Sequence, residues 1–227
     1  MTNFETNRAI NKELSRLYLE SSDLLINSWK TATQESPPER INEFGIIDEE
    51  RYDTDNGILF ICKETNGWDD EDFRNKLFFR NWMNGITRNG MPEGHHIHKH
   101  PQMWYNIGRW IRMIHDPDEN IEALSMKRED IIPEIGLIAF TNVNKVRGSA
   151  YAGKSFDIVL NHPEPWKVIQ KELEILKPKV VVCCGRGIHM LFMRNVVGFS
   201  GKLIDMPHPG ARKKTQSMLL DLKKQLS

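Results

Sequence analysis

Residues 57–67 read Gly-Ile-Leu-Phe-Ile-Cys-Lys-Glu-Thr-Asn-Gly, a continuous apolar run that leads into a polar cluster. An apolar run of this length, preceded by a glycine turn, is typical of a strand that is covered on both faces. The polar residues stand where such a strand should end. The stretch therefore favours an α/β fold, in which helices cover both faces of a parallel sheet.

The same pattern recurs three times toward the C-terminus. Apolar runs at 135–140 and 180–184 and a short strand-like segment at 202–205 are each followed by polar or glycine-containing residues. Ligands of open α/β sheets bind beyond the carboxyl ends of the strands, where loops present polar groups over a rigid scaffold. We therefore expect one composite site built from four strand ends, namely 63–67, 141–147, Gly185 and 206–210.

Segments with the apolar spacing of helices separate these strands. They span residues 4–32, 103–114, 165–176, 188–196 and 212–226, and the acidic residues at 69–72 favour another helix that holds Phe73, Leu77 and Phe78. The alternation predicts a three-layer α/β/α fold with a central four-stranded parallel sheet. We expect a single domain over residues 1–227, with residues 1–50 as a mostly helical N-terminal extension.

Composition and cysteine usage indicate the compartment. No apolar run approaches the length of a membrane span, and the first residues lack the basic and apolar pattern of a signal peptide. The cysteines Cys62, Cys183 and Cys184 lie in the apolar runs, and an odd number there indicates reduced core thiols. We expect a cytoplasmic monomer that does not associate with membranes.

The net charge of zero conceals an uneven distribution. Residues 131–227 hold 15 Lys and Arg against 7 Asp and Glu, so the rest of the chain is acidic by the same margin. A basic half indicates an anion-binding surface, such as the phosphate groups of DNA would use. Solvated helix faces would give the same composition, so charge alone leaves both interpretations open.

The strand-end motifs, in this order, resemble those of the uracil-DNA glycosylase superfamily, and most of all its iron–sulfur branch. The cluster Lys63-Glu64-Thr65-Asn66-Gly67 is similar to a Gly-Glu-Ala-Pro-Gly loop of that branch, and Thr141-Asn142-Val143 with Lys145 and Arg147 is similar to its second motif. Leu173, Pro178 and Gly185 resemble the third motif, and His208-Pro209-Gly210 resembles a final His-Pro-Ser. The resemblance covers roughly residues 57–225. It implies the fold of that superfamily and hydrolysis of the glycosidic bond of a deaminated or damaged base in DNA.

The chain departs from that pattern in ways that bear on function. Lys63 replaces a glycine, Thr65 and Asn66 replace Ala-Pro, and Gly210 replaces a serine. A four-cysteine cluster cannot be built from three cysteines, so we expect no iron–sulfur centre and no other cofactor. The alternative to an active glycosylase is a divergent or inactive relative that binds nucleic acid or a nucleotide at the same cleft.

The resemblance implies two catalytic residues. Glu64 would orient or deprotonate the water that attacks the sugar carbon, or stabilise the positive charge that develops there. His208 would donate a hydrogen bond to the base carbonyl that becomes anionic as the bond breaks. In a purely structural role, Glu64 would pair with Lys63 or cap the next helix, and His208 would be buried in a turn flanked by prolines.

The resemblance also implies residues that bind the base and the DNA backbone. Asn142 would read the Watson–Crick edge of an extruded base through its donor and acceptor, and Phe78 would stack on that base. A local turn for Asn142 and a core position for Phe78 are the alternatives. The phosphates of DNA would contact the basic residues Lys145, Arg147, Arg212, Lys213 and Lys214.

The His-rich segment 95–100 is the one candidate metal site. His96 and His100 have the spacing of a shared helix face, which zinc sites use. Pro101 follows directly, and no cysteine or carboxylate stands at the spacing of a known site, so we expect a solvated loop and no metal. A structural alternative is that the His- and Trp-rich residues 82–115 hold a protein partner.

Overall fold

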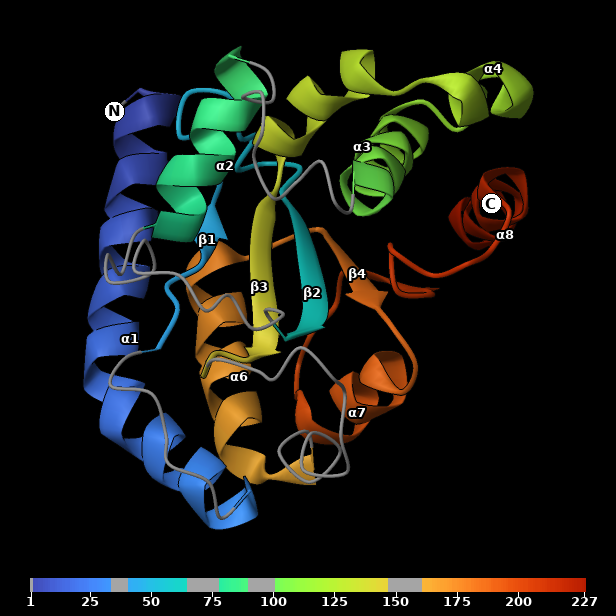
Figure 1. Ribbon diagram of the computed structural model, residues 1–227. Coiled ribbons are helices and arrows are strands. Elements are labelled where there is room, and N and C mark those ends of the chain that lie inside the picture. The colour runs from blue at the N-terminus through green and yellow to red at the C-terminus, as the bar shows by residue number, and fades with distance from the viewer. Residues whose placement is uncertain (1, 34–40, 65–77, 90–100, 147–160) are drawn as a thin grey trace.

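The computed structural model describes residues 2–33, 41–64, 78–89, 101–146 and 161–227. These residues form a mixed five-stranded sheet with helices around it (Figure 1). The α/β class predicted from the sequence is confirmed, whereas the prediction of a four-stranded, fully parallel sheet is wrong. Within these ranges, no helix combines the length and the apolar character that a membrane crossing requires.

Four parallel strands form most of the sheet: β2 (Ile58–Glu64), β3 (Ala139–Asn144), β4 (Val180–Cys184) and β5 (Lys202–Met206). The strand order is β1-β3-β2-β4-β5, so β2 lies between the two parallel strands that follow it along the chain. The strand order therefore reverses at β2, which is the kind of position where α/β sheets bind ligands. The fifth strand, β1 (Gly45–Ile46), pairs antiparallel with β3.

Strand β3 begins at Ala139, later than the predicted start at residue 135. The apolar residues before it form the 3₁₀ segment η3 (Glu129–Leu137), in which Ile131, Ile132 and Ile135 are buried. β3 then continues through the polar residues up to Asn144, and all its residues are buried. The polar residues that the sequence placed in a loop are therefore part of a core strand.

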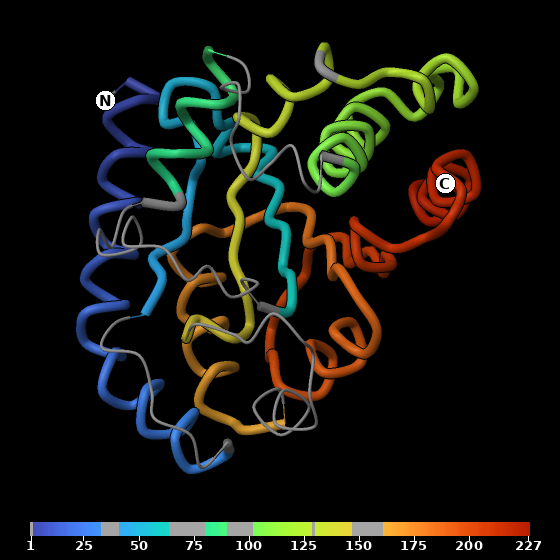
Figure 2. Tube along the Cα trace, viewed as in Figure 1, coloured from blue at the N-terminus to red at the C-terminus, as the bar shows by residue number. Residues whose placement is uncertain are grey.

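Helices cover the two faces of the sheet (Figures 1 and 2). On one face, which we call the α3 face, α3 (Pro101–His115) packs against α8 (Thr215–Leu226), and Trp104 lies 6.0 Å from Phe140 of β3 between ring centroids. On the other, the α6 face, α6 (Pro163–Leu176) contacts β3 and α7 (Ile188–Asn195) contacts β4. Two further helices, α2 (Phe78–Asn89) and α4 (Ile121–Met126), contact η3 and α8 respectively.

The N-terminal residues are built into this core. Helix α1 (Asn3–Thr33) has the predicted position, packs along α6, and buries Leu14, Tyr18 and Leu25. Strand β1 then enters the sheet beside β3. The segment 1–50 therefore supplies a strand and a core helix in addition to the helical character that the sequence predicts.

Both edges of the sheet carry a side-chain amide from a terminal helix. At β1, Asn11 of α1 accepts the backbone N–H of Ile46 at 3.0 Å and donates to its carbonyl at 3.1 Å. At β5, Gln225 of α8 accepts the N–H of Asp205 at 2.8 Å and donates to its carbonyl at 2.9 Å. Each amide supplies the hydrogen bonds that a neighbouring strand would otherwise make.

A buried polar cluster joins α1, β3 and α6. Lys145 Nζ lies 2.8 Å from Glu172 Oε1, with neither side chain exposed, and the Tyr18 hydroxyl donates to the same oxygen at 2.5 Å. Burial, and then the negative charge of Glu172, raise the pKa of Tyr18, so this hydroxyl keeps the proton that it donates. Burial lowers the pKa of Lys145, and the carboxylate of Glu172 opposes that change.

This burial does not agree with the prediction that Lys145 contacts DNA phosphate. The ammonium has no exposed surface, and its hydrogen bonds go to groups inside the protein. Lys145 is therefore a core residue in this structure.

Removal of one charge from the Lys145–Glu172 pair should cost more stability than removal of both. Lys145→Met leaves a buried carboxylate without its counter-charge, and we expect the free energy of unfolding to fall by about 3–5 kcal/mol. Adding Glu172→Gln keeps an acceptor for Tyr18 while burying no charge, so the double variant should regain a large part of that loss. Urea unfolding measures both changes, and equal losses in the two variants would contradict a charged pair.

Candidate functional site

The carboxyl ends of the parallel strands bring the predicted motifs to one edge of the sheet, which we call the carboxyl edge. In the strand register, Asn142 pairs with Cys62 and Glu64 pairs with Asn144. Gly185 directly follows β4, and His208 lies two residues beyond β5. The side chain of Glu64 lies outside the described part of the structure, which gives only its backbone place at the end of β2.

Gly185 and Lys63 meet where the strand order reverses. Gly185 has a φ of +112°, a conformation that favours glycine, and its N–H donates to the Met206 carbonyl at 2.8 Å. A Cβ at this position would lie 3.5–3.7 Å from Cγ, Cε and Cδ of Lys63. The aliphatic part of Lys63, which is half-buried, therefore lies along the glycine.

Helix α3 anchors the loop that holds His208. The buried Asn106 of α3 donates to the carbonyl of Pro209 at 2.7 Å, while its own Oδ1 accepts from Arg109 at 3.0 Å. The N–H of Ala211 donates to the His208 carbonyl at 2.8 Å and closes the turn. The position of His208 is thus fixed by α3 as well as by the end of β5.

The hydrogen bonding of His208 fixes its tautomer. The N–H of Gly210 donates to His208 Nδ1 at 3.0 Å, so the neutral ring carries its proton on Nε2. Although His208 keeps an exposed surface, the chain packed around its ring lowers its pKa, and the positive charge of Lys63 lowers that pKa further. At pH 7 the ring is therefore neutral, and Nε2–H is a hydrogen-bond donor.

The two predicted base-binding residues, Asn142 and Phe78, lie on β3 and α2. Asn142 is only 2% exposed and lies on the same side of β3 as Phe140, toward α3, whereas Thr141 faces α6. A base can reach the Asn142 amide only if the groups that cover it move. Phe78 is the first residue of α2, but its side chain lies outside the described part of the structure, as does all of Arg147.

The other predicted phosphate-binding residues lie together at a helix start. Arg212, Lys213 and Lys214 are exposed and directly precede α8, which has no acidic residue in its first turn. Arg186 is exposed just before α7, which also lacks an acidic residue there. Lys213 Nζ forms an exposed ion pair with Asp221 of α8 at 3.9 Å, whereas cations are otherwise unfavourable at the positive end of a helix. These side chains and two helix N-termini give this side of the carboxyl edge a positive potential.

The His-rich segment 95–100, for which a solvated loop without metal is the prediction, is not part of the described structure. Among the residues inside the described ranges, no group of three or more His, Cys, Asp or Glu could hold a metal ion.

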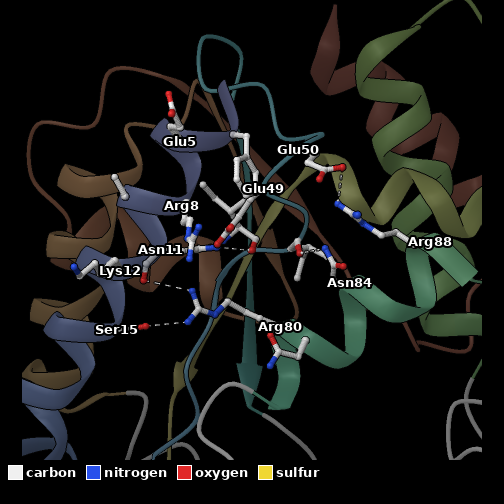
Figure 3. A pocket seen from close by; sticks show the side chains of 15 residues that line it. Glu5, Arg8, Asn11, Lys12, Ser15, Glu49, Glu50, Arg80, Asn84 and Arg88 are labelled. Carbon is white, nitrogen blue, oxygen red and sulfur yellow. Dashed lines mark hydrogen bonds and ion pairs between the residues drawn. The ribbon is translucent and has the colours of Figure 1, made fainter. Parts of the chain in front are cut away.

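A groove of about 910 Å³ lies between α1 and α2 (Figure 3). Two of the arginines that line it are held by partners from the surrounding chain: Arg88 lies 2.7 Å from Asp48, and Arg80 donates to Ser15 at 2.9 Å. Asn142 and His208, whose side chains the structure describes, are not among the residues that line it. We interpret the groove as the gap between packed elements that Arg80 and Arg88 bridge: Arg80 connects α2 to α1, and Arg88 connects α2 to the residues after β1.

Sequence reasoning missed three polar residues that organise the carboxyl edge and its support: Tyr18, Asn106 and Glu172. Tyr18 and Glu172 stand in the apolar stripes of their helices, and a polar residue at core spacing signals a buried partner. Asn106 has a comparable place between buried residues of α3. The partners themselves come from distant parts of the chain, so helix spacing could flag these residues but not pair them.

The effect of Lys63 on His208 is directly measurable. Lys63→Met keeps the aliphatic contact with Gly185 and removes the charge, so the pKa of His208 should rise toward its ordinary value of about 6.5. Ring signals in an NMR titration, assigned with His208→Gln, give this value. Lys202→Met, at the start of β5, is the matched control and should leave the titration unchanged. An unaltered His208 pKa in Lys63→Met would show that the lysine charge does not reach the ring.

The chain was also compared with known proteins. No protein-family model matches it, and no curated protein matches it significantly. The functional conclusion therefore depends on the geometry and the charges of the carboxyl edge.

Proposed function

We propose that the carboxyl edge binds a nucleotide unit of DNA and that the protein hydrolyses the glycosidic bond of a deaminated or damaged base. The observation that carries this proposal is the geometry of His208: its Nδ1 accepts the N–H of Gly210, which leaves Nε2–H of the neutral ring as a donor near Lys63, a residue at the point where the strand order reverses. A uracil-DNA glycosylase-like fold is part of the proposal. The order of the four parallel strands and the place of the motifs at their ends support it.

The proposed reaction needs two kinds of group. A water oxygen bonds to the sugar carbon as the bond from that carbon to the base nitrogen breaks, and the electron pair leaves with the base. His208 Nε2–H would donate to the base carbonyl that becomes anionic, and the charge of Lys63 would stabilise the same anion. Glu64, at the end of β2, would orient the water and accept its proton.

The charges around the edge suit a polyanion. Arg186 precedes α7, and Arg212, Lys213 and Lys214 precede α8, so the cations stand beside backbone N–H groups that can also bind phosphate. Phosphate contacts of this kind give affinity without reading sequence. We therefore expect the DNA backbone to pass along the starts of these two helices.

Binding without hydrolysis is the second candidate. Lys63 covers Gly185 where the strand order reverses, and the reading amide of Asn142 is 2% exposed. Both features restrict the entry of an extruded base. A divergent relative that holds nucleic acid or a nucleotide at the outer part of the edge would have this arrangement.

Glycosidic cleavage is tested with oligonucleotides that carry uracil, hypoxanthine or xanthine, probed with alkali for abasic sites. Glu64→Gln should lower the single-turnover rate about 100-fold with DNA affinity unchanged, because water activation acts only in the transition state. Asp205→Asn, which changes an exposed carboxylate of β5, is the control and should leave the rate unchanged. If the wild-type protein shifts DNA in a gel but releases none of these bases, the result would reject the glycosylase and favour a relative that only binds nucleic acid.

The cations before α8 should determine the salt dependence of DNA binding. Each lost phosphate contact should weaken affinity and lower the slope of log K against log salt by about one unit. We expect Lys213→Ala with Lys214→Ala to lower that slope by about two. The matched control is Lys171→Ala with Lys179→Ala, which removes one exposed lysine from α6 and another that directly precedes β4. Equal slopes in the two double variants would assign Lys213 and Lys214 to an ordinary solvated surface.

A further inference from the structure

We propose that Tyr18, Glu172 and Lys145 are positioning residues that hold the backbone of Asn142 from the opposite face of the sheet. This inference rests on the proposed function, in which the Asn142 amide reads the base. It gives α1 a role in the site, because Tyr18 of that helix donates the hydrogen bond to Glu172.

The ammonium of Lys145 is fully coordinated. A lysine ammonium has three donor hydrogens. Lys145 Nζ lies 2.7 Å from Thr141 Oγ1, 2.7 Å from the Asn142 carbonyl oxygen and 2.8 Å from Glu172 Oε1. One acceptor therefore exists for each donor, and two of the three belong to β3.

The surroundings leave the ammonium little freedom to move. The rings of Tyr18 and Phe44 have their centroids 5.6 Å and 5.7 Å from Lys145 Nζ, at cation–π distance. Glu172 Oε1 is itself fixed by two more donors, the Tyr18 hydroxyl at 2.5 Å and the Thr141 hydroxyl at 3.2 Å. Loss of any member would leave a buried polar group without its partner.

The hydrogen bond from Lys145 to the Asn142 carbonyl links the buried cluster to the backbone of Asn142. Fixing that oxygen fixes the peptide plane after Asn142, and with it the direction of the Asn142 side chain on the α3 face. An amide that distinguishes one base from another must be held to within about 0.5 Å. The α6 face thus sets the orientation of a group that acts on the α3 face.

Two variants test the inference with NMR on the free protein. Tyr18→Phe removes one hydroxyl, and Lys145→Met with Glu172→Gln removes the charges while leaving an acceptor. We expect the side-chain amide signal of Asn142 to shift in both, and backbone amide exchange at residues 142–145 to be about fivefold faster in Tyr18→Phe, as for the loss of one hydrogen bond. Leu25→Ala, a buried change in α1 outside the cluster, is the control and should leave the Asn142 signal in place.

A second measurement separates positioning from the proposed function. Where the wild type cleaves deaminated bases, the preference between uracil and hypoxanthine should narrow about tenfold in the double variant and stay the same in Leu25→Ala. If the Asn142 signal shifts in the variants but the wild type cleaves none of these bases, the positioning role holds and the glycosylase function is rejected. Unchanged Asn142 signals in a folded double variant would overturn the inference whatever the activity.

Discussion

The buried ammonium of Lys145 is the constraint on which much of this structure depends. A charge removed from water needs a counter-charge and an acceptor for every hydrogen, or it destabilises the fold by several kcal/mol. Here Glu172 of α6 supplies the counter-charge, and β3 supplies a hydroxyl and a carbonyl oxygen as acceptors. The phenol of Tyr18 in α1 donates a hydrogen bond to the same carboxylate. The cluster joins these three elements and also explains why polar residues stand inside a buried strand.

Apolar periodicity predicts most of this fold, and its failures have physical causes. The runs at 58–62 and 180–184 and the helix at 4–32 were confirmed because their burial follows from local spacing. Strand β3 was placed too early because Thr141, Asn142 and Asn144 resemble a loop until their distant partners are known. Strand β1 has two residues, too few for any pattern.

The sequence predicted which residues lie at the carboxyl ends of the strands, but not the contacts and protonation states of their side chains. Parallel pairing carries Glu64, Asn142, Gly185 and His208 to one edge, and their order along the chain was enough to expect it. The state of His208 depends on a backbone N–H two residues away and on Lys63, both matters of three-dimensional geometry. Lys145 was misassigned because a basic residue at a strand end has the same sequence pattern whether it faces solvent or the core.

The amides of Asn11 and Gln225 have a consequence for how this protein behaves among its own copies. A sheet edge with open N–H and C=O groups can recruit a strand from another chain, which is a route to aggregation. Here the first and the last helix occupy those groups at Ile46 and at Asp205. Helices α1 and α8 thus protect the two edges of the sheet, so fraying of either helix would expose backbone groups for edge-to-edge association.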